Sequence, residues 1–256
     1  MRWLCISDIE GDAVALAAVL ATAEGRGYSR VLCAGDLCFP GLDPLGVWRR
    51  LTTARATCVQ GVSDRAIATL DPASLSSDSP RSAERLAHLA RVRTELGEPI
   101  LRKLARLDTH VRIPLPNGTE ALLVHGSPMD PTEPFTHEMS DDEVRALLGD
   151  DPADLVICGG SHVPFDRTVL DVRIVNVGSV GGAVYQGGRF ADATFIEFLP
   201  GELGALDVRV EQVVIPLDGP ESRDPRDPQA PTEPAAGSDE SPPGSSRSDA
   251  RREGGP

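Results

Sequence analysis

The sequence predicts an α/β protein in which two β-sheets pack together and helices cover their outer faces. In the first part of the chain, short continuous apolar runs alternate with helical patterns, which is typical of strands buried on both faces. The last part contains strand patterns almost exclusively. The composition, 40% hydrophobic and 25% charged, is that of an ordinary globular protein. Together these observations favour a two-sheet sandwich with helices outside.

The expected elements of the first part alternate between strand and helix. Asp12 precedes an Ala/Leu-rich run that reads as a helix and ends at Gly25 and Gly27. Asp at this position caps a helix and suits the positive end of its dipole. The expected order is a strand at 2–7, this helix, a strand at 30–35, a helix at 44–55 and a short strand at 56–61.

The second part begins with a helix at about 82–107, whose leucines recur on one face. Two apolar runs then flank Asn117-Gly118, which is the strongest short signal for a β-hairpin. Further strands are expected at 154–160, 173–179, 193–199 and 207–215. We therefore expect one folded domain over residues 1–217.

Residues 218–256 differ in composition from the rest of the chain. They are rich in Pro, Ser, Gly and charge and have no large apolar residue. Such a segment cannot offset its ordering entropy by burial, so we expect it to be disordered. It is expected to be a solubilising extension, with a partner-docking segment as the alternative.

The net charge of −14 limits the classes of partner that the chain is expected to bind. It disfavours binding to a nucleic-acid duplex or an anionic membrane. A small phosphorylated ligand can still bind where a metal supplies positive charge. The N-terminus lacks the apolar region of a signal peptide, and no run reaches about 18 apolar residues. The chain is therefore expected to be cytoplasmic.

Five candidate site residues each follow an expected strand, and loops beyond strand ends are where sites assemble in such sheets. Carboxylate and imidazole groups converging from several loops are what a divalent metal pair requires. The alternative for the aspartates is that they form turns or cap helices. The alternative for the histidines is that they lie near the core with their hydrogen bonds satisfied. The five are Asp8, Asp36, Asp64, His125 and His162.

Six motifs around these residues resemble those of calcineurin-like metallophosphoesterases, in the same order. They are SDIEGD, AGDLCFPGLDP, VQGVSD, LLVHGSP, CGGSHVPF and NVGSVG, and they span about residues 1–200. The small YfcE-like and diadenosine-tetraphosphatase-like enzymes are the most similar branch. The resemblance implies a four-layer αββα sandwich of two mixed β-sheets. It also implies two metals, often Mn, Fe, Zn or Ni, that activate a water for attack on phosphorus.

The resemblance assigns roles to four of the residues. Asp8 and His162 match ligands of metal one, Asp36 matches the aspartate that bridges both metals, and His125 matches a ligand of metal two. Asp36, Asp64 and His125 are the candidate catalytic residues, with Asp64 or Ser63 positioning a leaving group.

Several ligand positions depart from the family pattern. Glu10 stands in place of a histidine of metal one, while Val62 and Gly160 replace an asparagine and a histidine of metal two. Ser63 stands where many members have a catalytic histidine. Glutamate is a competent oxygen donor, although Glu10 is alternatively a solvated loop acid. Mn, Mg or Fe is then favoured over Zn at metal one, and we expect one strong site and a second that is weak or absent.

Three functions fit this pattern. The first is a metal-dependent phosphoesterase that hydrolyses a phosphodiester or nucleotide, with the substrate completing the depleted site. The second is a catalytically inactive pseudo-phosphoesterase that binds a ligand or a protein partner. The third assigns a thiolate or redox role to Cys38, which follows Asp36 closely. The oligomeric state is not predicted.

Overall fold

The structure is a computed structural model, and it describes residues 1–217 apart from 151, 182, 186–187 and 203–204. The chain divides into two units, Met1–Pro225 and Arg226–Pro256. The described residues all belong to the first unit. The expected disordered segment 218–256 lies outside the described residues, so its prediction stays a prediction.

The first sheet combines parallel and antiparallel strands. Its order is β11 (Leu206–Pro216), β10 (Gly188–Pro200), β1 (Arg2–Ile6), β2 (Arg30–Cys33) and β3 (Thr57–Cys58), and β9 (Ala183–Tyr185) also pairs with β10. β1, β2 and β3 are parallel, whereas β10 is antiparallel to both β1 and β11. The C-terminal ends of β1 and β2 therefore meet at one edge of the sheet.

The second sheet has a parallel centre between antiparallel edges. Its order is β4 (His110–Pro114), β5 (Glu120–Val124), β6 (Leu155–Cys158), β8 (Val172–Asn176) and β7 (Phe165–Val169). β5, β6 and β8 are parallel, and β4 and β7 are antiparallel to their neighbours. The loops that follow β5 and β6 consequently leave from the same edge.

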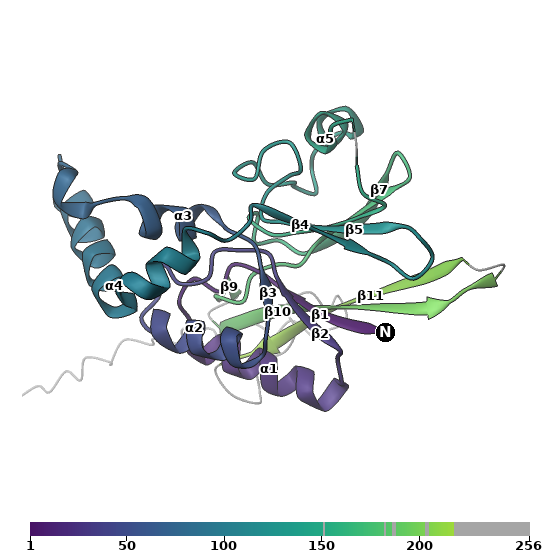
Figure 1. Cartoon of the computed structure of the whole chain (residues 1–256), viewed down its shortest axis with the longest axis horizontal. Helices are drawn as coiled ribbons and strands as arrows, with labels where there is room; N and C mark the ends of the chain where they lie inside the picture. The colour runs from purple at the N-terminus through teal and green to yellow at the C-terminus, as the bar shows by residue number, and fades with distance from the viewer. Residues whose placement is uncertain (151, 182, 186–187, 203–204, 218–256) are drawn as a thin grey trace, which may run out of the picture. The chain divides into compact units, whose positions relative to one another are not determined.

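Three layers of apolar side chains hold the sheets and helices together. Trp3 and Ile196 of the first sheet share a buried cluster with Leu123 and Ile157 of the second, so the two sheets pack face to face. The other face of the first sheet packs on α1 (Ala13–Arg26), α2 (Pro44–Thr53) and α4 (Pro80–Leu104). The outer face of the second sheet packs on α5 (Asp141–Leu148). These layers confirm the predicted αββα sandwich (Figure 1).

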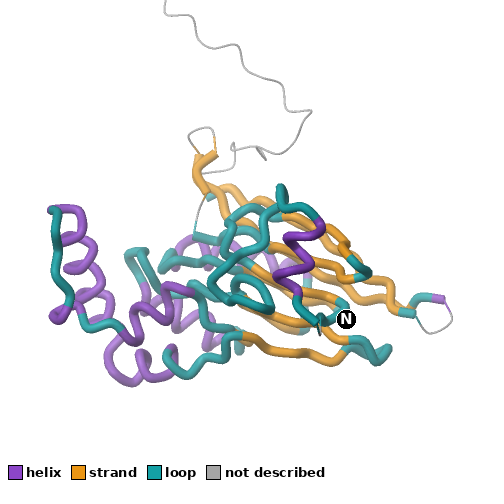
Figure 2. Tube along the Cα trace, turned by 90° about the horizontal axis from the view of Figure 1, so that it is seen from above, coloured by secondary structure: helices purple, strands orange, loops and turns teal. Residues whose placement is uncertain are grey.

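Helix starts follow the capping signals in the sequence. The carboxylate of Asp12 accepts hydrogen bonds from the backbone N–H groups of Val14 and Ala15, as expected for the first residue before α1. Asp43 does the same for Gly46 at the start of α2, where Pro44 occupies the first helical position. In the view from above, most helical segments lie to the left of the strands, and one short helix lies in front of them (Figure 2).

Some elements differ from the sequence prediction. β7, α3 (Val62–Thr69), α5 and the short 3-10 helix Pro72–Ser74 were not expected. β7 is an edge strand whose three central residues, Asp166, Arg167 and Thr168, are all polar, which leaves a weak apolar signal. The long helix α4 is present, but Gly97 has φ 71° and breaks it into two helices. None of the helices in the described part combines the length and apolarity that a membrane span requires.

Candidate metal centre

The loops after β1 and β2 run side by side and bring two carboxylates to one edge. The backbone N–H of Asp8 donates to the carbonyl of Gly35 at 3.0 Å, and the N–H of Glu10 donates to the carbonyl of Asp36 at 2.9 Å. These bonds extend the pairing of β1 with β2 past the last strand residues. The parallel register of the two strands is therefore what places Asp8 beside Asp36.

Four candidate site residues have a left-handed backbone. Asp8, Glu10 and Asp36 have φ values of 51°, 52° and 53°, and His162 has φ 60°. Non-glycine residues rarely adopt this conformation, and such outliers gather at functional sites where neighbouring structure holds them. The shared conformation turns each side chain out of its strand direction. The left-handed conformation that these residues share supports a common role for the three loops that carry them, which follow β1, β2 and β6.

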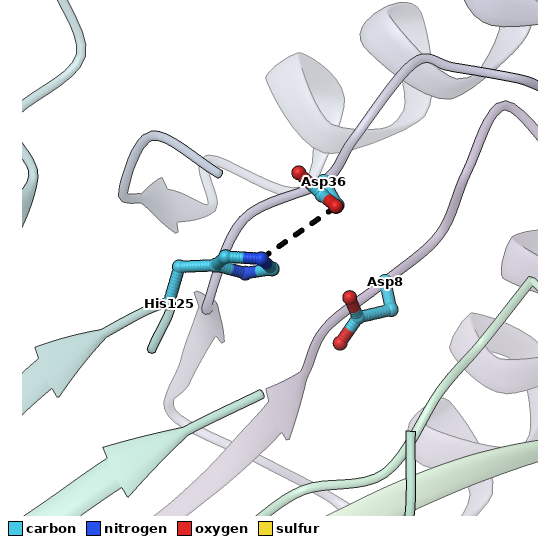
Figure 3. A group of neighbouring side chains, drawn as sticks. All are labelled: Asp8, Asp36 and His125. Atoms are coloured by element: carbon cyan, nitrogen blue, oxygen red, sulfur yellow. Dashed lines mark ion pairs between the residues drawn. The ribbon is translucent and has the colours of Figure 1, made fainter. Parts of the chain in front are cut away.

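Asp8, Asp36 and His125 form a compact group of possible metal ligands. One ligand atom from each lies within 4.8 Å of the other two, and Figure 3 shows the three side chains facing a shared space. Asp8 and His125 are buried, and Asp36 is half-buried. His125 Nε2 lies 3.5 Å from Asp36 Oδ2. The structure thus joins residues from both sheets in one group.

Backbone groups orient all three side chains. The N–H of Gly160 donates to Asp8 Oδ2 at 2.9 Å, and the N–H of Ser63 donates to Asp36 Oδ1 at 2.8 Å. His125 Nδ1 donates to the carbonyl of Ala34 at 2.7 Å, because a carbonyl can only accept. In the neutral form of the ring this bond leaves the lone pair on Nε2, which faces Asp36. This backbone bond is the usual support for a histidine that ligates a metal.

The remaining oxygen of Asp8 tests whether a metal fits. Asp8 Oδ1 is buried and accepts no hydrogen bond of regular geometry in the described part of the chain, although His162 Nε2 lies 3.3 Å from it. A buried carboxylate oxygen without a well-formed hydrogen bond is costly, and a cation would remove that cost. Two carboxylates and one imidazole are suitable ligands for Mn, Mg or Fe. The residues present therefore fit a divalent cation.

His162 and Glu10 lie at the border of this group. His162 Nε2 is 3.3 Å from Asp8 Oδ1 and 3.7 Å from Glu10 Oε1. The hydrogen bond and charge of Asp8, with the charges of Glu10 and Asp36, raise the pKa of His162 to about 9 against the opposing effect of burial. Burial raises the pKa of Glu10, and the charges of Asp8 and Asp36 raise it further. The charge of His162 acts in the opposite direction and lowers this pKa. Glu10 thus faces the site.

The two depleted positions lie close to the centre. Val62 is 47% exposed at the start of α3, and its apolar side chain offers no donor atom. Gly160 has φ 75°, and a Cβ built on it would lie 3.6 Å from His125 Nε2 and 3.1 Å from the Cβ of Pro134. A histidine at position 160 would therefore be near the centre but strained.

Asp64 takes a different position from the other candidates. Its side chain is fully buried, and its two oxygens accept hydrogen bonds from the N–H groups of Leu37 and Gly61, both at 3.0 Å. Burial, and then the charge of Asp36, raise the pKa of Asp64 to about 7. This geometry favours a role in holding the loops over a contact with a leaving group. Its catalytic role stays a prediction.

Gly61 shows how tightly these loops approach each other. A Cβ at Gly61 would lie 2.2 Å from both the backbone nitrogen and Oδ1 of Asp36, so only glycine fits here. The loop held by Asp64 therefore contacts the candidate ligand Asp36 directly.

Asn176 is a supporting residue that the sequence reasoning missed. Its side-chain N–H₂ donates to the carbonyl of Gly159 at 2.8 Å and to Ser161 Oγ at 2.9 Å. Its Oδ1 accepts from the N–H of Gly178 at 3.0 Å. Nearby, Ser179 Oγ donates to the carbonyl of Asp8 at 3.0 Å. The motif NVGSVG was the available signal, since it contains both residues.

Cys38 does not reach the site. Its side chain is buried in the apolar cluster beneath the first sheet, with Sγ 3.6 Å from the carbonyl of Pro44. Burial, and then the charge of Asp64, raise the pKa of this thiol well above its ordinary value. A protonated, buried thiol is neither a ready ligand nor a reactive group. The structure thus gives no support to the third functional hypothesis.

The sequence also matches a family model. Residues 1–195 match the calcineurin-like phosphoesterase superfamily domain, which covers all the loops described above. The chain belongs to the calcineurin-like phosphoesterase superfamily. The predicted resemblance is confirmed at this level, and the ligand positions that depart from the family motifs are departures within a genuine phosphoesterase fold.

Solved structures agree with this phosphoesterase fold. A metallophosphoesterase from Sphaerobacter thermophilus is 25% identical with a TM-score of 0.60, covering 83% of this chain and 88% of that one. A hypothetical protein from Pyrococcus horikoshii OT3 is 19% identical with a TM-score of 0.61, covering 83% and 87%. The phosphoesterase YfcE from E. coli is 18% identical with a TM-score of 0.47, covering 84% and 100%, which is too distant to assign a branch. No curated protein matches the chain.

Proposed function

We propose that this protein is a metal-dependent phosphoester hydrolase that acts on a small phosphodiester or nucleotide. The observation that carries the proposal is the convergence of Asp8, Asp36 and His125 in the described part of the chain, where the buried Asp8 Oδ1 accepts no hydrogen bond of regular geometry. Membership of the phosphoesterase superfamily supports the reaction class. Asp8, Asp36 and His125 would hold one divalent cation, and Glu10 and His162 would complete its surroundings.

A bound cation would lower the pKa of a water molecule and offset charge on the phosphoryl oxygens. The chain itself supplies preorganisation. Backbone N–H groups of Gly160 and Ser63 hold the two aspartates, and the carbonyl of Ala34 holds His125 in the tautomer with a free Nε2. Groups held in place before substrate arrives do not have to reorganise during the reaction.

The depletion of the second metal position shapes this proposal. Val62 and Gly160 offer no side-chain donor, so the proposed hydrolase has one strong site and a second that is weak or absent. Substrate oxygens would take the place of missing ligands, as they do at many magnesium sites.

Replacing Asp36 by Asn tests the function. Asp36→Asn keeps the size of the side chain and removes the charge that a cation needs. We expect Mn-dependent hydrolysis of bis(p-nitrophenyl) phosphate to fall at least a hundredfold, because a metal contributes several kcal/mol and each 1.36 kcal/mol is tenfold. The release of p-nitrophenol and the Mn content per chain are the measurements.

Asp171→Asn is the matched control, because Asp171 is an exposed turn residue with a left-handed backbone like that of Asp36. It is expected to keep wild-type activity. Hydrolysis by the wild type that is no faster than by Asp36→Asn would contradict the proposal. That outcome would favour the alternative of a pseudo-phosphoesterase, for which the apolar Val62 beside the centre is the specific observation.

A further inference from the structure

A cavity lies beside the candidate metal centre, and most of its lining residues are not candidate metal ligands. It has a volume of about 680 Å³ and lies between the loop after β2 and the first half of α4. Its lining residues are Glu10, Phe39, Pro40, Ser63, Arg81, Glu84, Arg85 and His88. The volume is within the usual range for a small-molecule site.

Two lining residues connect the cavity to the metal centre. Glu10 lines the cavity, and its Oε1 is 3.7 Å from His162 Nε2. Ser63 also lines the cavity, and its backbone N–H holds Asp36. Ser63 Oγ is buried without a hydrogen-bond partner in the described part of the chain. A molecule that reaches the centre therefore borders the cavity as well.

Arg81 and Arg85 place two positive charges on the wall opposite the centre. They are four residues apart on α4, so both lie on one face of the helix, where like charges repel. Both are exposed, and neither has an ion-pair partner within the ranges that the structure describes. Glu84 lines the same cavity without pairing with them. In a chain of net charge −14, this pair is a local attraction for an anion.

Two aromatic rings, those of Phe39 and His88, also line the cavity. The rings of Phe39 and His88 are 5.2 Å apart at an angle of 31°. Arg91 donates to His88 Nδ1 at 2.6 Å, so the other ring nitrogen donates to the carbonyl of Pro40. These bonds connect α4 to the loop after β2. The surface suits the flat face of an aromatic ring.

We propose that this cavity binds the distal part of a nucleotide-like substrate, with its aromatic ring on Phe39 and His88 and a second phosphate on Arg81 and Arg85. The inference rests on the proposed function for the reaction, while the cavity and its charges stand independently. Guanidinium groups bind phosphate through two parallel hydrogen bonds, which gives both affinity and orientation. The substrate class is thus a phosphoester that carries a further phosphate.

A matched pair of substrates tests this assignment. Thymidine 5′-(p-nitrophenyl phosphate) is compared with the same compound bearing a 3′-phosphate, in the presence of Mn. We expect the wild type to favour the 3′-phosphate by about tenfold to a hundredfold in kcat/KM, chiefly through KM. In the double variant Arg81→Gln/Arg85→Gln this preference is expected to fall below about twofold, because charge-assisted hydrogen bonds to the second phosphate are lost.

Arg102→Gln is the control, since Arg102 is exposed in the part of α4 after Gly97 and does not line the cavity. It is expected to keep the preference. A wild type without a preference, or a double variant that keeps it, would overturn the inference. Glutamine is a good helix former, and circular dichroism with melting curves verifies that α4 is retained.

A binding measurement separates this inference from the hydrolase function. Calorimetry compares thymidine 3′,5′-bisphosphate with thymidine 5′-monophosphate on wild type and double variant. Tighter binding of the bisphosphate that depends on the two arginines, without hydrolysis by the wild type, would refute the hydrolase and support the cavity as an anion site. Equal binding of both nucleotides by the wild type would overturn the inference whether or not hydrolysis occurs.

Discussion

Each single residue at this centre is held by at least one hydrogen bond to the backbone. Asp8, Asp36 and His125 each have one atom bound to a backbone group and one atom facing the shared space. Asp64 extends this pattern, because both of its carboxylate oxygens accept hydrogen bonds from backbone N–H groups near Asp36. A substitution at any of these residues is therefore expected to change both the metal centre and the conformation of the loop to which the residue is hydrogen-bonded.

Asp64 predicts a pH dependence of stability in the metal-free protein. Its folded-state pKa is about 7, above the ordinary value of 3.8, so the folded state retains a proton that the unfolded state loses. Its contribution is fully present below about pH 4 and is lost as the pH rises through 7. We expect the free energy of unfolding of wild type minus Asp64→Asn to decrease over this range.

Urea denaturation in the presence of a chelator at several pH values measures this difference. Asparagine can accept only one of the two backbone N–H groups, so the variant is expected to lose about 1–3 kcal/mol at pH 4. Asp171→Asn applies the same chemical change to an exposed turn and should show little effect. A difference that stays constant from pH 4 to 8 would argue against a raised pKa at Asp64.

At the scale of elements, the site depends on loops that leave the same edge of each sheet. Parallel pairing of β1 with β2 and of β5 with β6 brings their C-terminal ends together. The loop after β6 consists of residues 159–164, and the side chain of Asn176 at the end of β8 donates two hydrogen bonds to it. This supporting amide is expected to matter for the metal.

Asn176→Ala removes three hydrogen bonds of a fully buried side chain. We expect the variant to lose about 1–3 kcal/mol of stability, since buried backbone partners are left unpaired. The affinity for Mn is expected to fall about 10–100-fold, as is usual when a supporting partner of a ligand is lost. Denaturation curves and Mn titration measure the two effects.

Asn117→Ala is a suitable control, because Asn117 lies in the turn between β4 and β5 and its amide oxygen accepts from Thr119. Some stability is expected to be lost there without any change in Mn affinity. An unchanged Mn affinity in Asn176→Ala would show that the loop after β6 does not support the centre.

At the scale of the whole folded unit, the centre joins the two sheets. Asp8 and Asp36 follow strands of the first sheet, and His125 follows a strand of the second. A cation held by all three would bind only when both sheets are folded and packed. Metal binding is therefore expected to stabilise the unit as a whole rather than one loop.

Mn is accordingly expected to raise the melting temperature. At a free concentration of 100 times Kd, a ligand that binds only the folded state contributes about 2.7 kcal/mol. The increase is expected to disappear in Asp8→Asn/His125→Gln and to remain in Asp171→Asn. Differential scanning calorimetry with and without Mn measures it, and an equal increase in the double variant would place the metal elsewhere.

Much of this protein is determined by local sequence. Buried apolar runs ending in Asp or His predict the strands and the candidate ligands, because side-chain hydrophobicity and turn chemistry act over a few residues. The six ordered motifs predict the superfamily, which the family model confirms. Capping by Asp12 and Asp43 is equally local.

Only the tertiary structure decided which candidates meet. His125 joins Asp8 and Asp36, although 117 and 89 residues separate them along the chain. Cys38 is two residues from Asp36 in the sequence, but its side chain is buried in the apolar cluster beneath the first sheet. The carboxylate of Asp64 accepts a hydrogen bond from the N–H of Gly61 and is not part of the ligand group. The physical reason is that strand register and backbone hydrogen bonds set the direction of each side chain. Those contacts form only when the two sheets pack.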